Sequence, residues 1–517
     1  MRSAYLVLSI LAVSVLAPMV GLLNLSQLPG FEPQDLQFWQ SGYIRRVVFF
    51  SLWQALLSSL FSVIPAILVA RAFAQQGDFP FRSLILRLFG LPLVVPSIVA
   101  VLGIVSVYGS DGWIPLGRSL YGINGILLAH VFFNLPLAVR LLLPIWQLIP
   151  QRHSQLGEQM GFSQWHRWRY LEWPALREGL PGVLLLVFML CLTSFAVVLT
   201  LGGGPKSTTL EVAIYQSLRF DFDPAQAVIL AMLQLSLCIL VAIVMLRLQK
   251  LPEVEISIAS PASELANYRS LLNWVVIGLA SICVGLPLAS LLTDTLAGSL
   301  ARVVGNVTIW RSAAITLMLG LGAALLSVIA GWFLLRGSSE LANRGQFRRA
   351  KLVELCGSVI YVVPPLVIGT GIFVLLSDIV DVFEWVYPVV ILVNAMMGLP
   401  FVIRTLGPAM RQSQMRYQYL CHSLALGGWN RFRFVDWPLL RRPAGLSAAL
   451  VAALAMGDLG VIALFGTPHT ATLPLLIYQQ MGAYQIPQAT VTALLLLGLC
   501  LLVFSGLERY IGGKDEA

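Results

Sequence analysis

Residues 164–177 read QWHRWRYLEWPALR, and residues 428–441 read GWNRFRFVDWPLLR. The two stretches align when the chain is shifted by 264 residues, and the same shift leaves 14 of 43 positions identical between 135–177 and 399–441. Large, uncommon residues are among the matches, since Trp165-x-Arg167-x-Arg169-x3-Trp173-Pro174 returns as Trp429-x-Arg431-x-Arg433-x3-Trp437-Pro438. Self-similarity at a fixed distance is the signature of a duplicated structural unit. The sequence therefore predicts two homologous halves.

Weaker sequence similarities between the halves extend the repeat on both sides of this segment. FSVIPAILVAR, which ends at Arg71, resembles LSVIAGWFLLR, which ends at Arg336. Thr209-Leu210-x3-Ile214-Tyr215-Gln216 recurs as Thr472-Leu473-x3-Ile477-Tyr478-Gln479. Both halves therefore contain the same parts in the same order.

The composition indicates a membrane protein. The chain has 517 residues, of which 58% are hydrophobic and only 11% charged, whereas a soluble domain carries about 25% charged residues. The six cysteines include no CxxC pair, so neither a disulfide framework nor a metal site is expected. The net charge of +9 is explained by basic loops on one side of a membrane, and we expect contact with lipid and none with nucleic acid.

A spanning helix needs about 20 mostly apolar residues. The sequence contains about twelve such stretches, which predicts an all-α polytopic membrane protein with six transmembrane helices in each half. In order they are Tyr5–Leu25, Val47–Ala70, Leu84–Tyr108, Gly122–Ile149, Leu180–Leu201, Ala225–Leu246, Leu271–Leu296, Ser312–Leu335, Leu352–Leu376, Trp385–Gly407, Pro443–Phe465 and Gln488–Leu507.

The distribution of Lys and Arg predicts the orientation. If the amino terminus is cytoplasmic, all but seven of the 33 basic residues fall on the cytoplasmic side. Cytoplasmic loops carry an excess of Lys and Arg, so both termini are predicted to be cytoplasmic. The seven exceptions are Arg45, Arg46, Arg118, Lys206, Arg219, Arg302 and Arg311.

The polar segment 249–269 is predicted to be a cytoplasmic linker between the halves 1–248 and 270–517. Because each half has an even number of spans, both repeated loops, 151–178 and 411–442, fall on the same side of the membrane. A repeat of this kind is parallel, with its pseudo-twofold axis along the membrane normal and a pathway expected between the halves.

Each repeated loop is long, basic and aromatic, and begins with a segment free of proline. These segments, Ser154–Phe162 and Gln418–Leu426, predict a short surface helix in each loop, followed by Trp-Pro at the start of the next membrane helix. Trp and Arg also anchor helix ends at the lipid interface, and this alternative stays open for Trp173 and Trp437. It does not explain the duplicated helix-forming segment, which favours docking to two copies of a soluble partner.

The two loops resemble the EAA motif of bacterial ABC importer permeases, whose pattern is E-A-A-x3-G followed by a Trp and then a Pro. Gln155, Leu156 and Gly157 stand where E-A-A is expected, with Gly161 at the glycine position. In the second copy Tyr419, Leu420 and Cys421 take these places, and Ala425 replaces the glycine. Both three-residue cores depart from the pattern, so the assignment depends on the spacing to Trp165, Trp429, Pro174 and Pro438 and on the duplication.

Across nearly its whole length the chain resembles the fused, two-half permease of the thiamine (thiamine pyrophosphate) ABC importer, within the binding-protein-dependent transport inner-membrane component family. The most specific segments begin with LTLGGGPKSTTLEVAIYQSLRF at Leu199 and GDLGVIALFG at Gly457. The resemblance implies a bacterial inner-membrane channel subunit with two copies of a cytoplasmic ATP-binding subunit and a periplasmic thiamine-binding protein as partners. It places the contact with the binding protein on the repeated outer segments, at Thr209, Tyr215, Gln216, Thr472, Tyr478 and Gln479.

The chain itself contains no Walker-type segment. We therefore expect no catalytic residue and no bound cofactor in it, with ATP hydrolysed by the separate subunit. The resemblance to the EAA motif gives the coupling role to the two loops, at Gln155, Gly157, Gly161, Trp165, Arg167, Arg169, Trp173 and Pro174, and at Tyr419, Cys421, Ala425, Trp429, Arg431, Arg433, Trp437 and Pro438.

Polar residues within predicted spans are candidates for the translocation pathway, because ionised side chains are costly there. Asp458 lies in the predicted eleventh span, and its equivalent in the first half is Ser194. His130 and Asn394 are equivalent positions in the fourth and tenth spans. An acid near the pathway could attract the cationic thiazolium of thiamine. Capping or pairing within the bundle is the alternative for Asp458, as interhelical hydrogen bonding is for His130 and Asn394.

Two other transporter classes remain as alternatives. A permease for ferric iron or another small solute would share the two-half layout. An ion-coupled secondary carrier would need several membrane acids and no long duplicated loop. The sequence has one convincing membrane acid and two such loops, which favours the ATP-driven importer.

Overall fold

The computed structural model describes residues 40–512, except for 249–270, 297–304, 378–380, 382–383 and the single residues 78, 111, 148, 150, 427 and 468. Of the first 39 residues it describes only Ser9 and Met19. Every regular element in the part described is helical. The predicted linker, 249–269, lies outside the described residues, as does the predicted first span, Tyr5–Leu25, apart from Ser9 and Met19.

Nine helices in the described ranges are long and apolar enough to cross a bilayer, and two shorter apolar helices accompany them. Together they correspond to the second to twelfth predicted spans. The long spans are built on α2 (Gly42–Gln76), α5 (Ile123–Gln147), α8 (Trp173–Leu192), α11 (Pro224–Leu248), α12 (Leu271–Leu296), α14 (Val307–Asn343), α17 (Val386–Ser423), α19 (Trp437–Met456) and α22 (Ile486–Gly512). The shorter ones are α4 (Ser97–Tyr108) and α16 (Pro365–Ser377).

The third and ninth predicted spans are not single helices. The third consists of α3 (Arg82–Leu88), the 3-10 turn η3 (Leu91–Leu93) and α4, and the ninth of α15 (Phe347–Val359), η7 (Ile360–Val362) and α16. Pro96 directly precedes α4, and Pro364 directly precedes α16. Proline lacks the backbone donor and disfavours helix in the residue before it, so both spans divide at the same place in the repeat.

The fifth and eleventh predicted spans are also divided. Helix α8 ends at Leu192 before the short α9 (Ala196–Leu201), and α19 ends at Met456 before α20 (Gly460–Phe465). Asp458 lies within the eleventh span, as predicted, but the helix is interrupted there. Asp458 lies in the break, where its carboxylate accepts a hydrogen bond from the Gly460 N–H at 3.0 Å, and Ser194 occupies the equivalent break in the first half.

The two halves repeat the same packing. In the first half α2 packs against α5 and α8, and in the second α14 packs against α17 and α19. Both α2 and α14 begin at a capping side chain, since Ser41 accepts from the Ile44 N–H and Asn306 from the Thr308 N–H. Pro65 lies inside α2, and Pro136 and Pro144 lie inside α5, without ending these buried helices.

The halves are interlocked by the two short apolar helices. Helix α4 of the first half packs against α12 and α22, and α16 of the second half packs against α10 and α11. The α4–α12 contact is close enough to require glycine at Gly103, because a Cβ there would collide with the carbonyl oxygen of Pro287. Side-chain size at this crossing is therefore constrained by the contact between halves.

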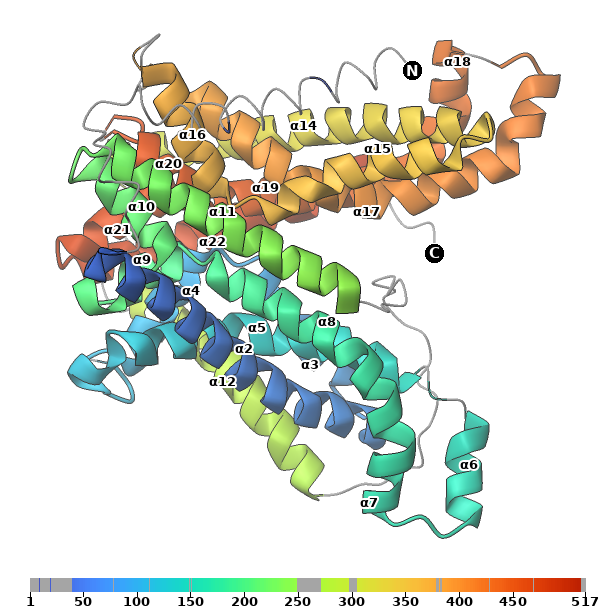
Figure 1. Ribbon diagram of the computed structural model, residues 1–517, viewed down its shortest axis with the longest axis horizontal. Coiled ribbons are helices and arrows are strands. Elements are labelled where there is room, and N and C mark those ends of the chain that lie inside the picture. Colours follow the sequence, from blue (N-terminus) through green and yellow to red (C-terminus); the bar gives the residue numbers. More distant parts are fainter. Residues whose placement is uncertain are drawn as a thin grey trace.

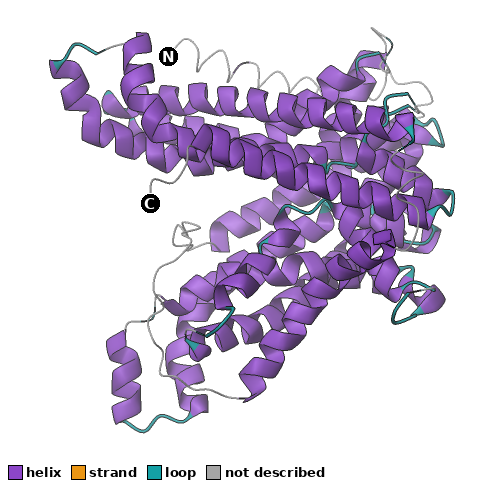
Figure 2. Cartoon of the chain, turned by 180° about the vertical axis from the view of Figure 1, so that it is seen from behind, coloured by secondary structure: helices purple, strands orange, loops and turns teal. Residues whose placement is uncertain are grey.

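The bundle has the outline of a V (Figures 1 and 2). The halves meet at the end that carries α9, α10 (Leu210–Arg219), α20 and α21 (Leu473–Gly482), where α10 contacts α20. They diverge toward the opposite end, which carries α6 (Gln151–Gln159) and α7 (Gln164–Arg167) on one arm and α18 (Gly428–Arg431) on the other. The repeated loops thus lie at the same end of the molecule, as a parallel repeat requires.

Candidate coupling and transport site

The first repeated loop begins with the separate helix α6, which ends at a left-handed turn. Gly161 has φ +66°, the Phe162 N–H donates to the Gly157 carbonyl at 2.8 Å, and the Gly161 N–H donates to the Glu158 carbonyl at 3.0 Å. This pair of bonds satisfies carbonyls that a helix end leaves free, and it favours glycine at the left-handed position. Ser163 then caps α7, with its Oγ accepting from the His166 N–H.

The second loop is built differently at its start. The predicted separate helix Gln418–Leu426 is wrong, because α17 continues without a break to Ser423. In the first half the sequence places Pro150 between α5 and α6, whereas the equivalent residue in the second half is Gln414, which permits the helix to continue. The end is nevertheless the same: Ala425 has φ +51°, and the Leu426 N–H donates to the Cys421 carbonyl at 2.8 Å.

The two loops expose the same pattern of side chains. Gly157 and Cys421 are buried, while large apolar residues at equivalent positions project outward. Most of the predicted coupling residues with polar or small side chains are exposed, namely Gln155, Gly161, Arg169, Tyr419, Ala425 and Arg433. The remaining arginines, Arg167 and Arg431, are half-buried. The exposed fractions of the paired apolar side chains are 53% and 52% for Leu156 and Leu420, 71% and 60% for Met160 and Leu424, 63% and 70% for Trp165 and Trp429, and 41% each for Trp173 and Trp437. Exposed apolar faces of this kind mark sites of contact with other proteins.

A π-helical segment follows in each loop, at the same place in the repeat. These segments are η5 (Trp168–Glu172) and η8 (Phe432–Asp436), and each leads directly into Trp-Pro. Each ends on an acid, Glu172 or Asp436, which sequence reasoning did not identify. They are not identical in the two copies, which have Glu at one position and Asp at the other, so the search for identical residues did not find them. Comparing charge at equivalent positions would have found them.

Of the four pathway candidates, the structure brings two together. The Asn394 side-chain amide donates to Asp458 Oδ2 at 3.3 Å, next to the half-buried break between α19 and α20. His130 instead makes its contact within the first half, with Nδ1 at 2.8 Å from Ser58 Oγ. Ser194 is half-buried in the equivalent break. Within the described residues, Asp458 forms no ion pair with a Lys or Arg side chain.

The predicted contact surface for a binding protein is mostly interior. Thr209, Tyr215 and Thr472 are buried, so in this structure they are not available to a protein outside; Gln216 and Tyr478 are half-buried, and Gln479 is exposed. The repeated Thr-Leu pair has a structural role instead. The Leu210 N–H donates to Ser51 Oγ, and the Leu473 N–H donates to Thr316 Oγ1, each at 2.9 Å.

Equivalent residues of the halves approach each other where the arms meet. Burial raises the pKa of the Tyr215 hydroxyl to about 12, and the neighbouring Tyr478 contributes in the same direction. Arg219, at the end of α10, donates to the Gly466 carbonyl of the second half at 2.7 Å. The bond from Arg219 to Gly466 joins the two halves at this end.

No group of three or more His, Cys, Asp or Glu side chains suited to a metal ion occurs in the part of the chain described. The two loops offer exposed apolar faces for docking, and the fifth and eleventh spans are interrupted within the membrane.

Comparison with known proteins matches both halves. The family described as "Binding-protein-dependent transport system inner membrane component" matches residues 63–251 and 337–513. The chain is 44% identical to the thiamine transport system permease protein ThiP of Brucella abortus (strain 2308), over 98% of this chain and 95% of that protein. It is 41% identical to ThiP of Escherichia coli (strain K12), over 93% and 92%, and 35% identical to ThiP of Haemophilus influenzae, over 94% and 92%.

Proposed function

The chain belongs to the family of binding-protein-dependent transport system inner membrane components, and on this premise we propose that it is the permease subunit of a thiamine importer driven by ATP. It is an inner-membrane protein and not itself an enzyme. The observation that carries the proposal is the match of the whole chain, both halves included, to thiamine permeases.

Membership of the family implies an ATP-binding subunit and a periplasmic binding protein as partners. We propose that the ATP-binding subunit is present in two copies, one on each loop. The matched exposure of Leu156, Met160 and Trp165 with their equivalents supports this stoichiometry. ATP-driven closure of the two subunits then draws the loops together. The arms of the V approach each other at the loop end and separate at the end where they now meet. The proposal requires no cofactor bound to this chain and no contact with nucleic acid, and the apolar outer face contacts lipid.

Within the membrane we propose that the break at Asp458 faces the pathway. Asp458 is half-buried, and its carboxylate lacks a cationic partner among the described side chains, whereas thiamine carries a fixed positive charge on its thiazolium ring. Asn394 orients the carboxylate, whereas Ser194 offers only a hydroxyl at the equivalent place and His130 bonds to Ser58 within the first half. On the outer side, Gln216, Tyr478 and Gln479 are the remaining candidates for contact with the binding protein.

The test is uptake of labelled thiamine by inner-membrane vesicles that contain this chain with its ATP-binding subunit and binding protein. We expect uptake to require ATP and all three proteins, with thiamine phosphates as competitors and ferric iron without effect. Asp458→Asn, which keeps the shape of the side chain, should raise the KM for uptake and leave assembly intact. Uptake driven by an ion gradient without ATP, or uptake of ferric iron alone, would instead support one of the alternatives.

A further inference from the structure

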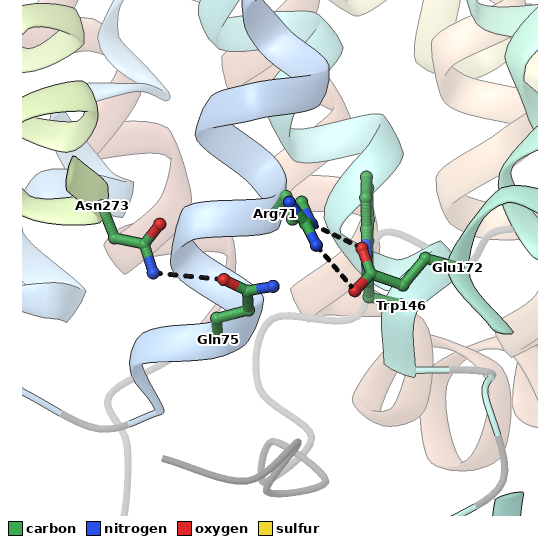
Figure 3. Close-up of polar contacts among 5 residues, drawn as sticks. All are labelled: Arg71, Gln75, Trp146, Glu172 and Asn273. Atoms are coloured by element: carbon green, nitrogen blue, oxygen red, sulfur yellow. Dashed lines mark hydrogen bonds and ion pairs between the residues drawn. The ribbon is translucent and has the colours of Figure 1, made fainter. Parts of the chain in front are cut away.

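Glu172, the last residue of η5, is an almost fully buried acid with three hydrogen bonds. Arg71 Nε donates to Oε2 at 2.7 Å and Arg71 Nη2 donates to Oε1 at 3.3 Å, so the guanidinium grips both carboxylate oxygens (Figure 3). The Trp146 indole N–H donates to Oε2 at 3.3 Å. The exposed fractions of the two charged side chains are 7% for Glu172 and 23% for Arg71. Two-point pairs of this kind are both strong and directional.

These contacts join three elements at the wide end of the V. Arg71 comes from α2, Trp146 from the end of α5, and Glu172 from η5, the part of the first loop that leads into α8. Arg71 also lies over the ring of Trp168, with its Cζ 5.2 Å from the ring centroid. The start of η5 and its end are thus both fixed to α2.

The same end of α2 is tied to the other half. Gln75, one turn beyond Arg71, accepts a hydrogen bond at 3.2 Å from the side-chain amide of Asn273 in α12, the first described helix of the second half (Figure 3). Movement of the first loop can therefore reach α2 through Glu172 and α12 through Gln75.

The second half lacks this arrangement. Asp436, the equivalent of Glu172, pairs with Arg431 of its own loop at 3.6 Å. Arg336, which corresponds to Arg71, pairs with Glu340 of its own helix at 3.8 Å, and the position of Trp146 is taken by Met410, which has no N–H to donate. The first loop is therefore clamped to α2 and α5 by direct bonds. In the second half Arg336 attracts Asp436 through its charge, but the direct ion pairs are local.

We propose that Glu172 is a positioning residue that makes the first loop and its half move as one body, so that ATP-driven displacement of the loop is converted into opening of the pathway. The inference rests on the proposed function, since it requires a motor on the loop. It assigns unequal roles to the two loops: the first transmits movement through the Arg71–Glu172 clamp, and the second does not depend on Asp436 in this way.

The test uses the assembled transporter in proteoliposomes and measures thiamine taken up per ATP hydrolysed. Glu172→Gln keeps the shape of the side chain but removes its charge. We expect uptake per ATP to fall by roughly 2- to 30-fold, the range for residues that carry coupling, while the ATP-binding subunit still co-purifies. The matched control, Asp436→Asn in the second loop, should leave the ratio close to that of the unaltered protein.

Exchange of the charges, Arg71→Glu with Glu172→Arg, should recover part of the ratio lost in either single variant. If Glu172→Gln fails to assemble, Arg71→Lys is measured in its place. Lysine keeps the positive charge but cannot bond to both carboxylate oxygens in the same way, so uptake per ATP should fall by less. An unchanged ratio in the assembled Glu172→Gln or Arg71→Lys transporter, or an equal fall in Asp436→Asn, would overturn the inference. Absence of thiamine uptake by the unaltered transporter would instead contradict the proposed function, and a fall in the ratio for whichever solute is carried would still support the clamp.

Discussion

At the scale of single residues, the two loops reach one backbone geometry with different side chains. Gly161 and Ala425 both adopt a left-handed conformation, and the residue after each donates back to the equivalent carbonyl, that of Gly157 or Cys421. Glycine takes this conformation freely, whereas an L-residue with a Cβ is destabilised there by roughly 1–2 kcal/mol. The turn is therefore maintained in the second loop at a cost in stability.

This difference predicts opposite effects of two exchanges. Gly161→Ala should destabilise the end of α6 by about 1 kcal/mol, and Ala425→Gly should stabilise the end of α17 by a similar amount. A Cβ at Gly161 would meet no atom within 4 Å, so the effect is conformational and not steric. Hydrogen exchange of the Phe162 and Leu426 amides measures it at each site.

Gly498 provides the control for these exchanges. It lies within α22, where an added Cβ would meet no atom within 4 Å and the backbone is helical, so Gly498→Ala should stabilise by about 0.5–1 kcal/mol. Faster exchange in Ala425→Gly than in the unaltered chain would contradict the account given for the turn.

Glu211 predicts a pH dependence of stability. It lies in α10, outside the membrane-spanning helices, and burial raises the pKa of its carboxyl from 4.5 to about 8, with a hydrogen bond from Gln234 acting in the opposite direction. Between these values the folded protein holds a proton that the unfolded chain has released. The free energy of unfolding should therefore fall as pH rises through this range, by about 1.4 kcal/mol per pH unit.

Glu211→Gln should remove this part of the slope. The measurement is the thermal unfolding midpoint of the purified protein in lipid nanodiscs between pH 5.5 and pH 8.5, for the unaltered chain and the variant. A difference between the two midpoints that stays constant across the range would show that Glu211 does not gain a proton on folding.

At the scale of elements, the short helices α10 and α21 are held by hydroxyl groups from the long helices behind them. Ser51 of α2 accepts from the Leu210 N–H, and Thr316 of α14 accepts from the Leu473 N–H. These N–H groups belong to the first turn, where a helix offers no acceptor of its own. The hydroxyl groups thus replace the missing partners inside the protein.

Removing either hydroxyl should leave a buried N–H unpaired. Ser51→Ala and Thr316→Val should each lower the free energy of unfolding by about 1–3 kcal/mol, the cost of an unsatisfied buried donor. Ser236→Ala is the control, because the exposed Ser236 hydroxyl donates only to the Met232 carbonyl of its own helix. Thermal unfolding in nanodiscs checks all three, and equal midpoints for Ser51→Ala and Ser236→Ala would refute the anchoring role.

The sequence predicted which segments repeat and which enter the membrane, but not where the spans divide. Pro65 and Pro136 lie inside continuous helices, whereas Pro96 and Pro364 separate helical pieces. Hydropathy is high in all four cases, and the outcome depends on whether packed neighbours satisfy the freed backbone groups. The break at Asp458 has no proline at all and was missed for that reason.

Site residues were predictable where the two copies use the same side chain. Trp165 and Trp429 are identical in the repeat and lie on equivalent exposed faces. Ser51 with Thr316 and Glu172 with Asp436 were not identified, because each pair conserves a hydroxyl or a charge and changes the residue. The burial of Thr209, Tyr215 and Thr472 could not be read from their repetition, since a repeated polar residue can equally well face the interior.

At the scale of the whole molecule, the V is held closed at one end by contacts between the halves. Arg219 bonds to the Gly466 carbonyl, α10 packs against α20, and α4 and α16 each insert against the opposite half. The far ends of the arms, with α7 and α18, diverge (Figure 1). With the loops on the cytoplasmic side, as the sequence predicts, this arrangement would be the inward-facing state of the proposed transport cycle.

The proposed cycle predicts that ATP reverses which end is open. Spin labels on Gln164→Cys and Asn430→Cys, both exposed on the loops, should approach each other when a non-hydrolysable ATP analogue is added to the assembled transporter. A second pair at the exposed Phe222→Cys and Tyr484→Cys, on the opposite end, should move apart, because rigid arms that close at one end separate at the other. The exposed Cys356 and the half-buried Cys283 are first replaced by serine so that labelling is confined to the chosen sites. If both pairs shorten together, the arms fold inward without pivoting, and alternating access by rocking of the two halves is wrong for this protein.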